Sequence, residues 1–190
     1  MRHLVVVLLV TCVAISSELR GQETVQLGIP GVPLPARSLS DVWRLSTVVV
    51  VGAVAKSSAP TLDRSMVSRV QTVNIDEVLK GPRSLTPGSQ IHVRILGGTI
   101  RSNGTEHRSA YEIEPLLTSE RLILFLSEVP GKPGDTQLYE LTVGASSVIR
   151  RPETSPTVKL DPRSPASLAE FKGRTTVPFD EIASFLRSLR

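Results

Sequence analysis

Alternating apolar and polar residues in the middle of the chain predict β-strands. The clearest case is Ile91-His92-Val93-Arg94-Ile95, where every second residue is apolar, as expected for a strand with one face on a core. Residues 47–54 and 121–126 are apolar almost throughout, which predicts fully buried strands. Residues 66–79 carry Val, Ile and Thr and are predicted as a further strand, although some of their spacing is helical.

Turn residues separate these segments. Gly52 lies inside the first apolar run and indicates a bulge or a sharp bend. Thr86-Pro87-Gly88 places Pro and Gly at the central positions of a type II turn, and Asn103-Gly104 is a hairpin turn pair. Shorter strands are predicted within 110–114, 137–143 and 146–150. Six or seven short strands between turn signals predict a small barrel or sandwich.

Two short helices complete the pattern. Ser38-x-x-Asp41 is typical of a helix start, and apolar residues at helical spacing follow it, so a helix is predicted over 38–46, with Trp43 as a lid on the core. Pro178 suits a first helical position. The residues after it predict one apolar helix face made of Phe179, Ile182, Ala183, Leu186 and Leu189.

The N-terminus has the pattern of a secretory signal peptide. Arg2 gives a basic start, residues 4–15 are apolar apart from Thr11, and small or polar residues follow. The apolar stretch is too short for a membrane-spanning helix, and no other long apolar run occurs. We therefore expect cleavage between residues 16 and 22 and a secreted or periplasmic protein with no transmembrane segment in the mature chain. The alternative is a lipoprotein anchored through Cys12.

Composition narrows the possible chemistry. Cys12 is the only cysteine, so the mature chain has no disulfide and no Cys-rich zinc site, and an apolar core must hold it. The formal net charge of +4 falls to +3 without the signal peptide, a weak field for nucleic acid. Binding of single strands also needs aromatic stacking platforms, and Tyr111 is the only aromatic residue near the scattered basic positions. No nucleic-acid partner is predicted.

The order of strand and turn signals is similar to that of a known domain. The residues that carry the similarity are Val49-x-x-Gly52-x-Val54, Val78-Leu79-Lys80-Gly81, Gly88-x-x-Ile91-x-Val93, Gly97-Gly98, Pro115 and Glu120-Arg121-Leu122-Ile123-Leu124-Phe125-Leu126. Over residues 47–148 the chain resembles a largely uncharacterised domain of exported bacterial proteins with an OB-type, netrin/TIMP-like β-barrel. Ser119 stands where that pattern has Gly. The resemblance implies a mainly β fold: a small OB-like antiparallel barrel with a short N-terminal helix and a C-terminal helix.

The resemblance does not transfer an activity. Tissue inhibitors of metalloproteinases work through an N-terminal cysteine and disulfides, and the mature chain has neither, so protease inhibition is not expected. The predicted organisation is a signal peptide at 1–21, a Pro/Gly linker at 22–37, a β-barrel domain at 38–150, a Pro/Ser/Thr connector at 151–175 and a C-terminal helix at 176–190.

No catalytic motif is present. The chain lacks a nucleophile elbow, a His-Glu-x-x-His zinc motif and phosphate-binding glycine loops, and only His92 and His107 remain after processing. The best polar cluster is Glu106, His107, Tyr111, Glu112 and Glu114. Its oxygens and imidazole could hold a divalent ion or act as acid and base, but a solvated loop and outward strand face is the preferred interpretation. No catalytic residue, cofactor or metal is therefore predicted; His107, Glu112 and Glu114 are the positions to examine.

Three functional hypotheses follow. The preferred one is an exported, non-catalytic binding module whose partner is a protein or another envelope component. The polar segments 56–65, 99–108 and 130–136 are its candidate contact loops, because loops on a rigid frame are suited to binding. The second is an exported hydrolase whose site, around His107 and Glu112, forms only in the fold. The third is a structural envelope protein whose C-terminal helix docks on a partner.

Overall fold

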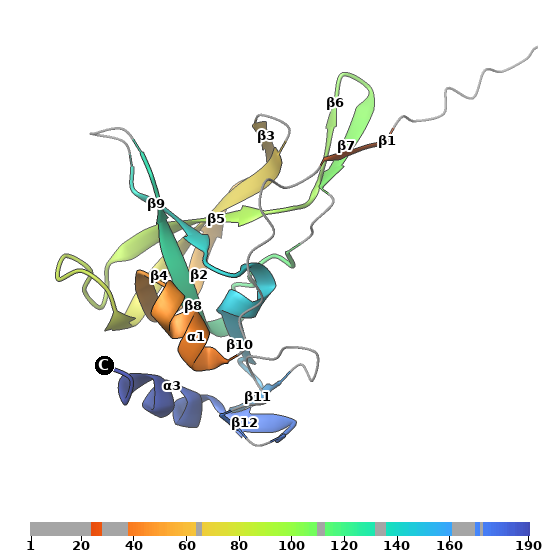
Figure 1. Cartoon of the computed structure of the whole chain (residues 1–190). Helices are drawn as coiled ribbons and strands as arrows, with labels where there is room; N and C mark the ends of the chain where they lie inside the picture. The colour runs from red at the N-terminus through yellow and green to blue at the C-terminus, as the bar shows by residue number, and fades with distance from the viewer. Residues whose placement is uncertain are drawn as a thin grey trace, which may run out of the picture.

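The chain folds into a mainly β structure with one short N-terminal and one C-terminal helix, as predicted (Figure 1). The structure is a computed structural model that describes residues 24–27, 38–63, 66–109, 113–131, 136–160, 170–171 and 173–190. The signal-peptide prediction and Cys12 lie outside these residues. Among the described residues, no helix has the length and apolar character needed to cross a membrane.

The elements follow one another along the chain with short connections. They are β1 (Thr24–Leu27), α1 (Leu39–Leu45), β2 (Val48–Ser57), β3 (Thr61–Asp63), β4 (Met66–Lys80), β5 (Gln90–Leu96), β6 (Thr99–Ser102), β7 (Thr105–Ser109), β8 (Glu120–Val129), β9 (Leu138–Leu141), the 3₁₀ turn η1 (Gly144–Ser147), β10 (Val148–Pro152), β11 (Thr157–Lys159), β12 (Thr176–Pro178) and α3 (Phe179–Arg187).

Five of the described strands form a ring. β2 pairs with β4 and β8, β4 with β5, β5 with β9, and β9 returns to β8. Because a closed ring of an odd number of strands cannot alternate direction throughout, one pair must be parallel, and it is β5–β9. That pair joins only His92, Val93 and Arg94 to Leu138, Tyr139 and Glu140. The ring is therefore uneven and partly closed, not a regular barrel.

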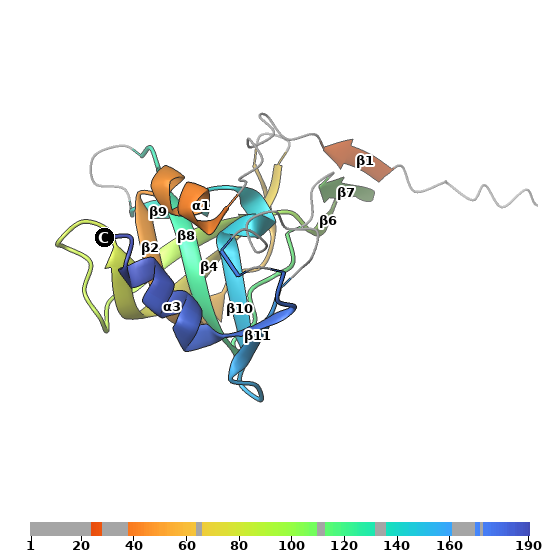
Figure 2. The ribbon, with the colours of Figure 1, turned by 60° about the horizontal axis from the view of Figure 1, so that its bottom comes forward.

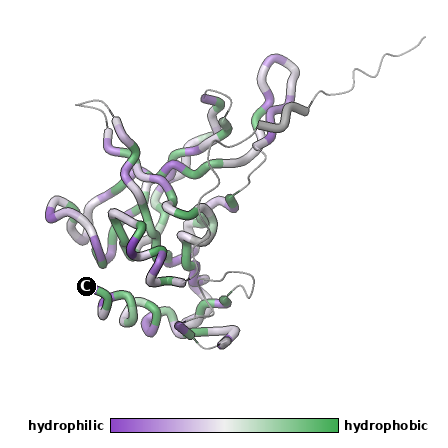
Figure 3. The backbone as a smooth tube through the Cα atoms, viewed as in Figure 1, coloured by the Kyte–Doolittle hydropathy of each residue, from purple (hydrophilic) through white to green (hydrophobic). Residues whose placement is uncertain are grey.

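The strands bury residues on two sides. Inside the ring lies an inner core of aliphatic side chains: Val48, Val50, Val54, Val73, Ile75, Ile91, Val93, Ile95, Leu122, Leu124 and Leu126, with Ile113, Leu116 and Tyr139. An outer core lies between the ring and the helices: Leu39, Val42, Trp43, Val49, Val51, Leu79, Ile123, Phe125, Val143, Ile149, Val158, Leu160, Phe171, Val177, Phe179, Ile182, Ala183 and Leu186. Figure 3 shows the same apolar stretches along the ring strands and α3.

Bulges between β2 and β4 fit these strands to both cores. The register shifts beside Val49 and Val51, so that Leu79 reaches the outer core although Val73 and Ile75 line the inner core. Gly52, predicted to mark a bulge, lies at one of these shifts. A Cβ added there would stand 2.2 Å from the backbone oxygen of Asn74, a contact that requires glycine.

Both helices cover the outer face of the ring (Figure 2). The α1 helix begins as predicted, because the Ser38 hydroxyl accepts a hydrogen bond from the Asp41 amide at 3.0 Å. The α3 helix buries the predicted face into the outer core. Pro178 was predicted as the first helical residue, but it is the last residue of β12, and the helix begins at Phe179. The guanidinium groups of Arg121 and Arg151 lie 5.6 and 5.4 Å from the Phe179 ring.

Several segments predicted as loops contain strands. Residues 56–65 include the end of β2 and the short β3, which pairs with β4. Within 151–175, predicted as a connector, β10 ends and β11 forms a hairpin with β12. In the predicted strand at 110–114, residues 110–112 lie outside the described residues, and Ile113 and Glu114 are not in a strand. β10 begins two residues later than the strand predicted at 146–150.

Candidate functional site

Of the polar cluster predicted from the sequence, the structure describes Glu106, His107 and Glu114. Tyr111 and Glu112 lie outside the described residues. His107 is on β7, where its Nδ1 atom is buried without a hydrogen-bond partner. The Glu114 carbonyl accepts a hydrogen bond from Arg150 at 2.6 Å, while its side chain is exposed. Among the described residues, no three His, Cys, Asp or Glu side chains lie close enough together to hold a metal ion.

The other histidine lies in the polar outer face predicted for β5. His92 Nδ1 is 3.2 Å from the Thr72 hydroxyl on β4, and Arg94 forms an ion pair with Glu140 on β9. These contacts join neighbouring strands across the outside of the ring. None of these contacts brings a carboxylate to the imidazole, whereas a Ser-His-Asp site requires one.

The segment 99–108, predicted as a contact loop, is a β-hairpin that projects from the ring (Figure 1). Its two-residue turn has Asn103 at φ 52° and Gly104 at φ 79°, the positive values of a type I′ turn. At the base, Gly97 donates to the Val67 carbonyl at 2.8 Å and Ser109 to the Gly98 carbonyl at 3.1 Å. The hairpin is therefore anchored at one end only.

The hairpin has two edges, and one already carries an added strand. β1 pairs with β7 in parallel, with Thr24 opposite Glu106 and Leu27 opposite Ser109, residues that are 82 positions apart in sequence. The other edge is β6, which is terminal in this sheet among the described strands. Hydrogen-bonded and non-hydrogen-bonded pairs alternate from the turn. The N–H and C=O of Arg101, opposite Glu106, therefore point away from the hairpin.

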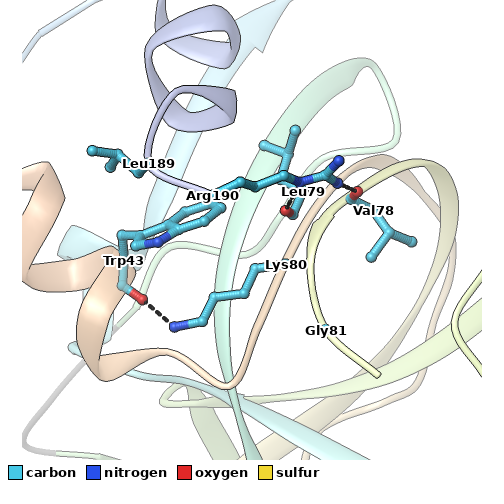
Figure 4. A pocket seen from close by; sticks show the side chains of 7 residues that line it. All are labelled: Trp43, Val78, Leu79, Lys80, Gly81, Leu189 and Arg190. Atoms are coloured by element: carbon cyan, nitrogen blue, oxygen red, sulfur yellow. Dashed lines mark hydrogen bonds between the residues drawn. The ribbon is translucent and has the colours of Figure 1, made fainter. Parts of the chain in front are cut away.

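A separate pocket of about 410 Å³ lies at the opposite end of the molecule (Figures 1 and 4). It forms where α1, the end of β4 and the residues after α3 meet. Its lining residues are Trp43, Val78, Leu79, Lys80, Gly81, Leu189 and Arg190. The β4 bulges shape this pocket, because they place Leu79 in the outer core and Lys80 opposite Val49.

Two cations define the electrostatics of the pocket. The Lys80 ammonium donates to the Trp43 carbonyl at 2.7 Å and lies 5.6 Å from the Trp43 ring centre. Burial lowers the pKa of Lys80. The Arg190 Nε donates to the Leu79 carbonyl at 2.7 Å, and its Nη2 donates to the Val78 carbonyl. Neither cation forms an ion pair with any described acidic residue.

Glu77 is the acidic residue close to this region, and another arginine holds it. Its carboxylate accepts two hydrogen bonds from Arg187, at 2.8 and 2.7 Å. That interaction, with weaker contributions from Arg190 and Arg121, keeps the pKa of Glu77 below its usual value. Glu77 therefore interacts mainly with Arg187 and offsets the charge of Arg190 only weakly.

The sequence did not predict this pocket. Lys80 was part of the strand-and-turn pattern at residues 78–81. Trp43 was predicted as a lid on the core, and it is indeed buried, at 8% exposure. Trp43, Lys80 and Arg190 are far apart in sequence, and the bulges in β4 determine the direction of the Lys80 side chain. The only available signal was a lysine immediately after a buried strand.

Comparison with known proteins adds no assignment. No protein-family model matches the chain, and no curated protein is significantly similar to it. The resemblance to exported OB-type domains therefore stays a prediction.

Proposed function

We propose that this protein is an exported, non-catalytic binding module that holds an extended segment of a partner protein in the cell envelope by strand addition to the β6–β7 hairpin. The observation that carries the proposal is the pairing of β1 with β7: this hairpin accepts an extended tetrapeptide on one edge. The edge of β6 presents the same kind of main-chain groups. Strand addition is a common mode of peptide recognition, with main-chain hydrogen bonds providing affinity.

The form of the hairpin favours this use. It stands away from the ring, so an added strand meets little steric obstruction there (Figure 1). Thr99 and Arg101 are exposed along β6, and a short, polar edge strand limits the aggregation that a long apolar edge causes. On this face Arg101 forms an ion pair with Glu106 of β7 at 3.8 Å.

The competing hypotheses find less support in the geometry. A hydrolase around His107 would need a nucleophile or carboxylate at the imidazole, and its Nδ1 has no hydrogen-bond partner. A structural protein that docks through the C-terminal helix would need a free apolar face on α3, yet Phe179, Ile182, Ala183 and Leu186 are buried against the ring. Strand addition needs neither feature.

The proposal is tested by photo-crosslinking in the producing cells with a crosslinking amino acid at position 99. The expected product is a conjugate with an extended segment of one envelope protein, mapped by mass spectrometry. Arg101→Pro should abolish the conjugate, because proline removes the N–H on the free edge. Arg101→Ala, the matched control, removes only the side chain and should retain most of it.

Two results would contradict the proposal. One is an undiminished conjugate in Arg101→Pro, provided that circular dichroism shows the fold intact. The other is enzymatic turnover by the purified protein in a broad hydrolase screen, with the activity lost in His107→Ala. The second result would establish the hydrolase hypothesis instead.

A further inference from the structure

We infer that the pocket formed by Trp43, Lys80 and Arg190 binds a small organic anion with an apolar body, such as an alkyl or aryl carboxylate. The inference goes beyond strand addition, because this pocket lies at the other end of the molecule from the hairpin (Figure 1). Its volume, about 410 Å³, falls within the range of small-molecule sites, which are typically apolar with a few polar groups that fix the ligand.

The walls of the pocket supply the apolar part. Trp43 of α1 and Leu189, which follows α3, line the space, and Val78 of β4 borders it with its side chain turned toward the inner core (Figure 4). Val78 and Leu189 are half-buried and pack at the margins of the inner and outer core, respectively. An alkyl chain or an aromatic ring in contact with them would gain roughly 25 cal/mol for each Å² of apolar surface removed from water.

The two cations supply the polar part. The Lys80 ammonium has three N–H groups and gives one to the Trp43 carbonyl, so two remain for a ligand. The Arg190 guanidinium uses Nε and Nη2 on the carbonyls of Leu79 and Val78, which holds the side chain in place while other N–H groups stay available. Fixed donors beside an apolar wall favour a carboxylate over a neutral head group.

The surrounding charges select against other ligands. A cation would meet Lys80 and Arg190 with no described acidic side chain in the pocket lining, and the nearby Glu77 is held by Arg187. Inorganic phosphate would satisfy the charges but leave the contacts with Trp43 and Leu189 unused. Burial already lowers the pKa of Lys80, so an anion beside its ammonium would offset an unfavourable charge.

The chain provides its own reporter for a test. Trp43 is the only tryptophan, so intrinsic fluorescence reports directly on the pocket. Octanoate, 1-octanol and octylammonium share one alkyl body and differ in head-group charge. Titrated into the purified protein, octanoate should produce a saturable change in Trp43 emission at a concentration at least tenfold below that needed for octanol. Octylammonium should bind more weakly still, and inorganic phosphate alone should not saturate the signal.

Matched variants assign the effect to the pocket. Lys80→Gln should weaken octanoate binding about tenfold while leaving octanol binding unchanged, and Arg190→Gln should do the same if Lys80→Gln fails to fold. Lys56→Gln, at the far end of β2 and exposed, should change neither. Equal affinity for octanoate and octanol, octanoate affinity unaffected by the folded Lys80 or Arg190 variant, or no saturable change would each overturn the inference. None of these results bears on crosslinking at the hairpin.

Discussion

The inner and outer cores are built in different ways. The inner core takes alternate residues from ring strands, such as Ile91, Val93 and Ile95 of β5. This strand is paired with β4 along its whole length. The outer core joins the outward residues of β2 and β8 to α1, β10, β11, β12 and α3. These segments are far apart along the chain. A strand therefore contributes side chains to both cores only where its sequence is apolar on both faces.

This difference explains two kinds of strand. In β2 and β8 successive residues point to different cores, as with Leu122 and Ile123, so the sequence is continuously apolar. In β5 the outward positions are His92 and Arg94, which contact polar neighbours, so the sequence alternates. The strands with continuous apolar runs are those that α1 and α3 cover. The comparison indicates that the ring defines the fold and that the covering layer creates the pocket.

The largest expected effect comes from the inner core. Leu124 is fully buried inside the ring, and Leu124→Ala should lower the free energy of unfolding by about 2–5 kcal/mol, because it removes buried methyl groups and leaves a cavity. Urea denaturation followed by circular dichroism measures the loss. Leu45→Ala, at a position 47% exposed, is the control and should change stability by less than about 0.5 kcal/mol. Equal effects would refute the placement of the inner core.

A much smaller effect is expected from the ion pair on the covering layer. Because Arg187 lowers the pKa of Glu77, the pair stabilises the folded state above the usual pKa of the carboxyl, and this contribution is lost as pH falls through the lower folded-state value. Glu77→Gln should cost at most about 1 kcal/mol at neutral pH, since both partners are partly exposed. In urea denaturation the difference from wild type should vanish in acid. A pH-independent difference would contradict this origin.

The sequence predicted the ring better than the layer that covers it. Ile91, Val93 and Ile95 could be placed because a half-buried strand has a period of two, and the apolar face of α3 because a helix has a period of 3.6. The sequence did not predict β11, because Thr157–Lys159 contributes only one buried residue, Val158. Its partner β12 begins after 16 intervening residues. Pairings across such distances leave no local pattern.

The candidate sites were predictable to different degrees. Asn103-Gly104 indicated a hairpin turn, and the structure has that turn; its pairing with β1 had no local signal. The pocket requires Trp43, Lys80 and Arg190 to converge from three elements, and bulges set the direction of Lys80. No spacing along the chain encodes that convergence.

Native-state hydrogen exchange tests most directly whether the ring and the covering layer differ in stability. β2 and β8 are each paired on both sides, whereas α3 has nine residues, too few to persist in water without its tertiary contacts. The α3 amides should therefore exchange through a partial opening that costs less free energy than global unfolding, while the β2 and β8 amides should exchange only on global unfolding. Equal protection of α3 and β8 at every denaturant concentration would contradict the division into two regions.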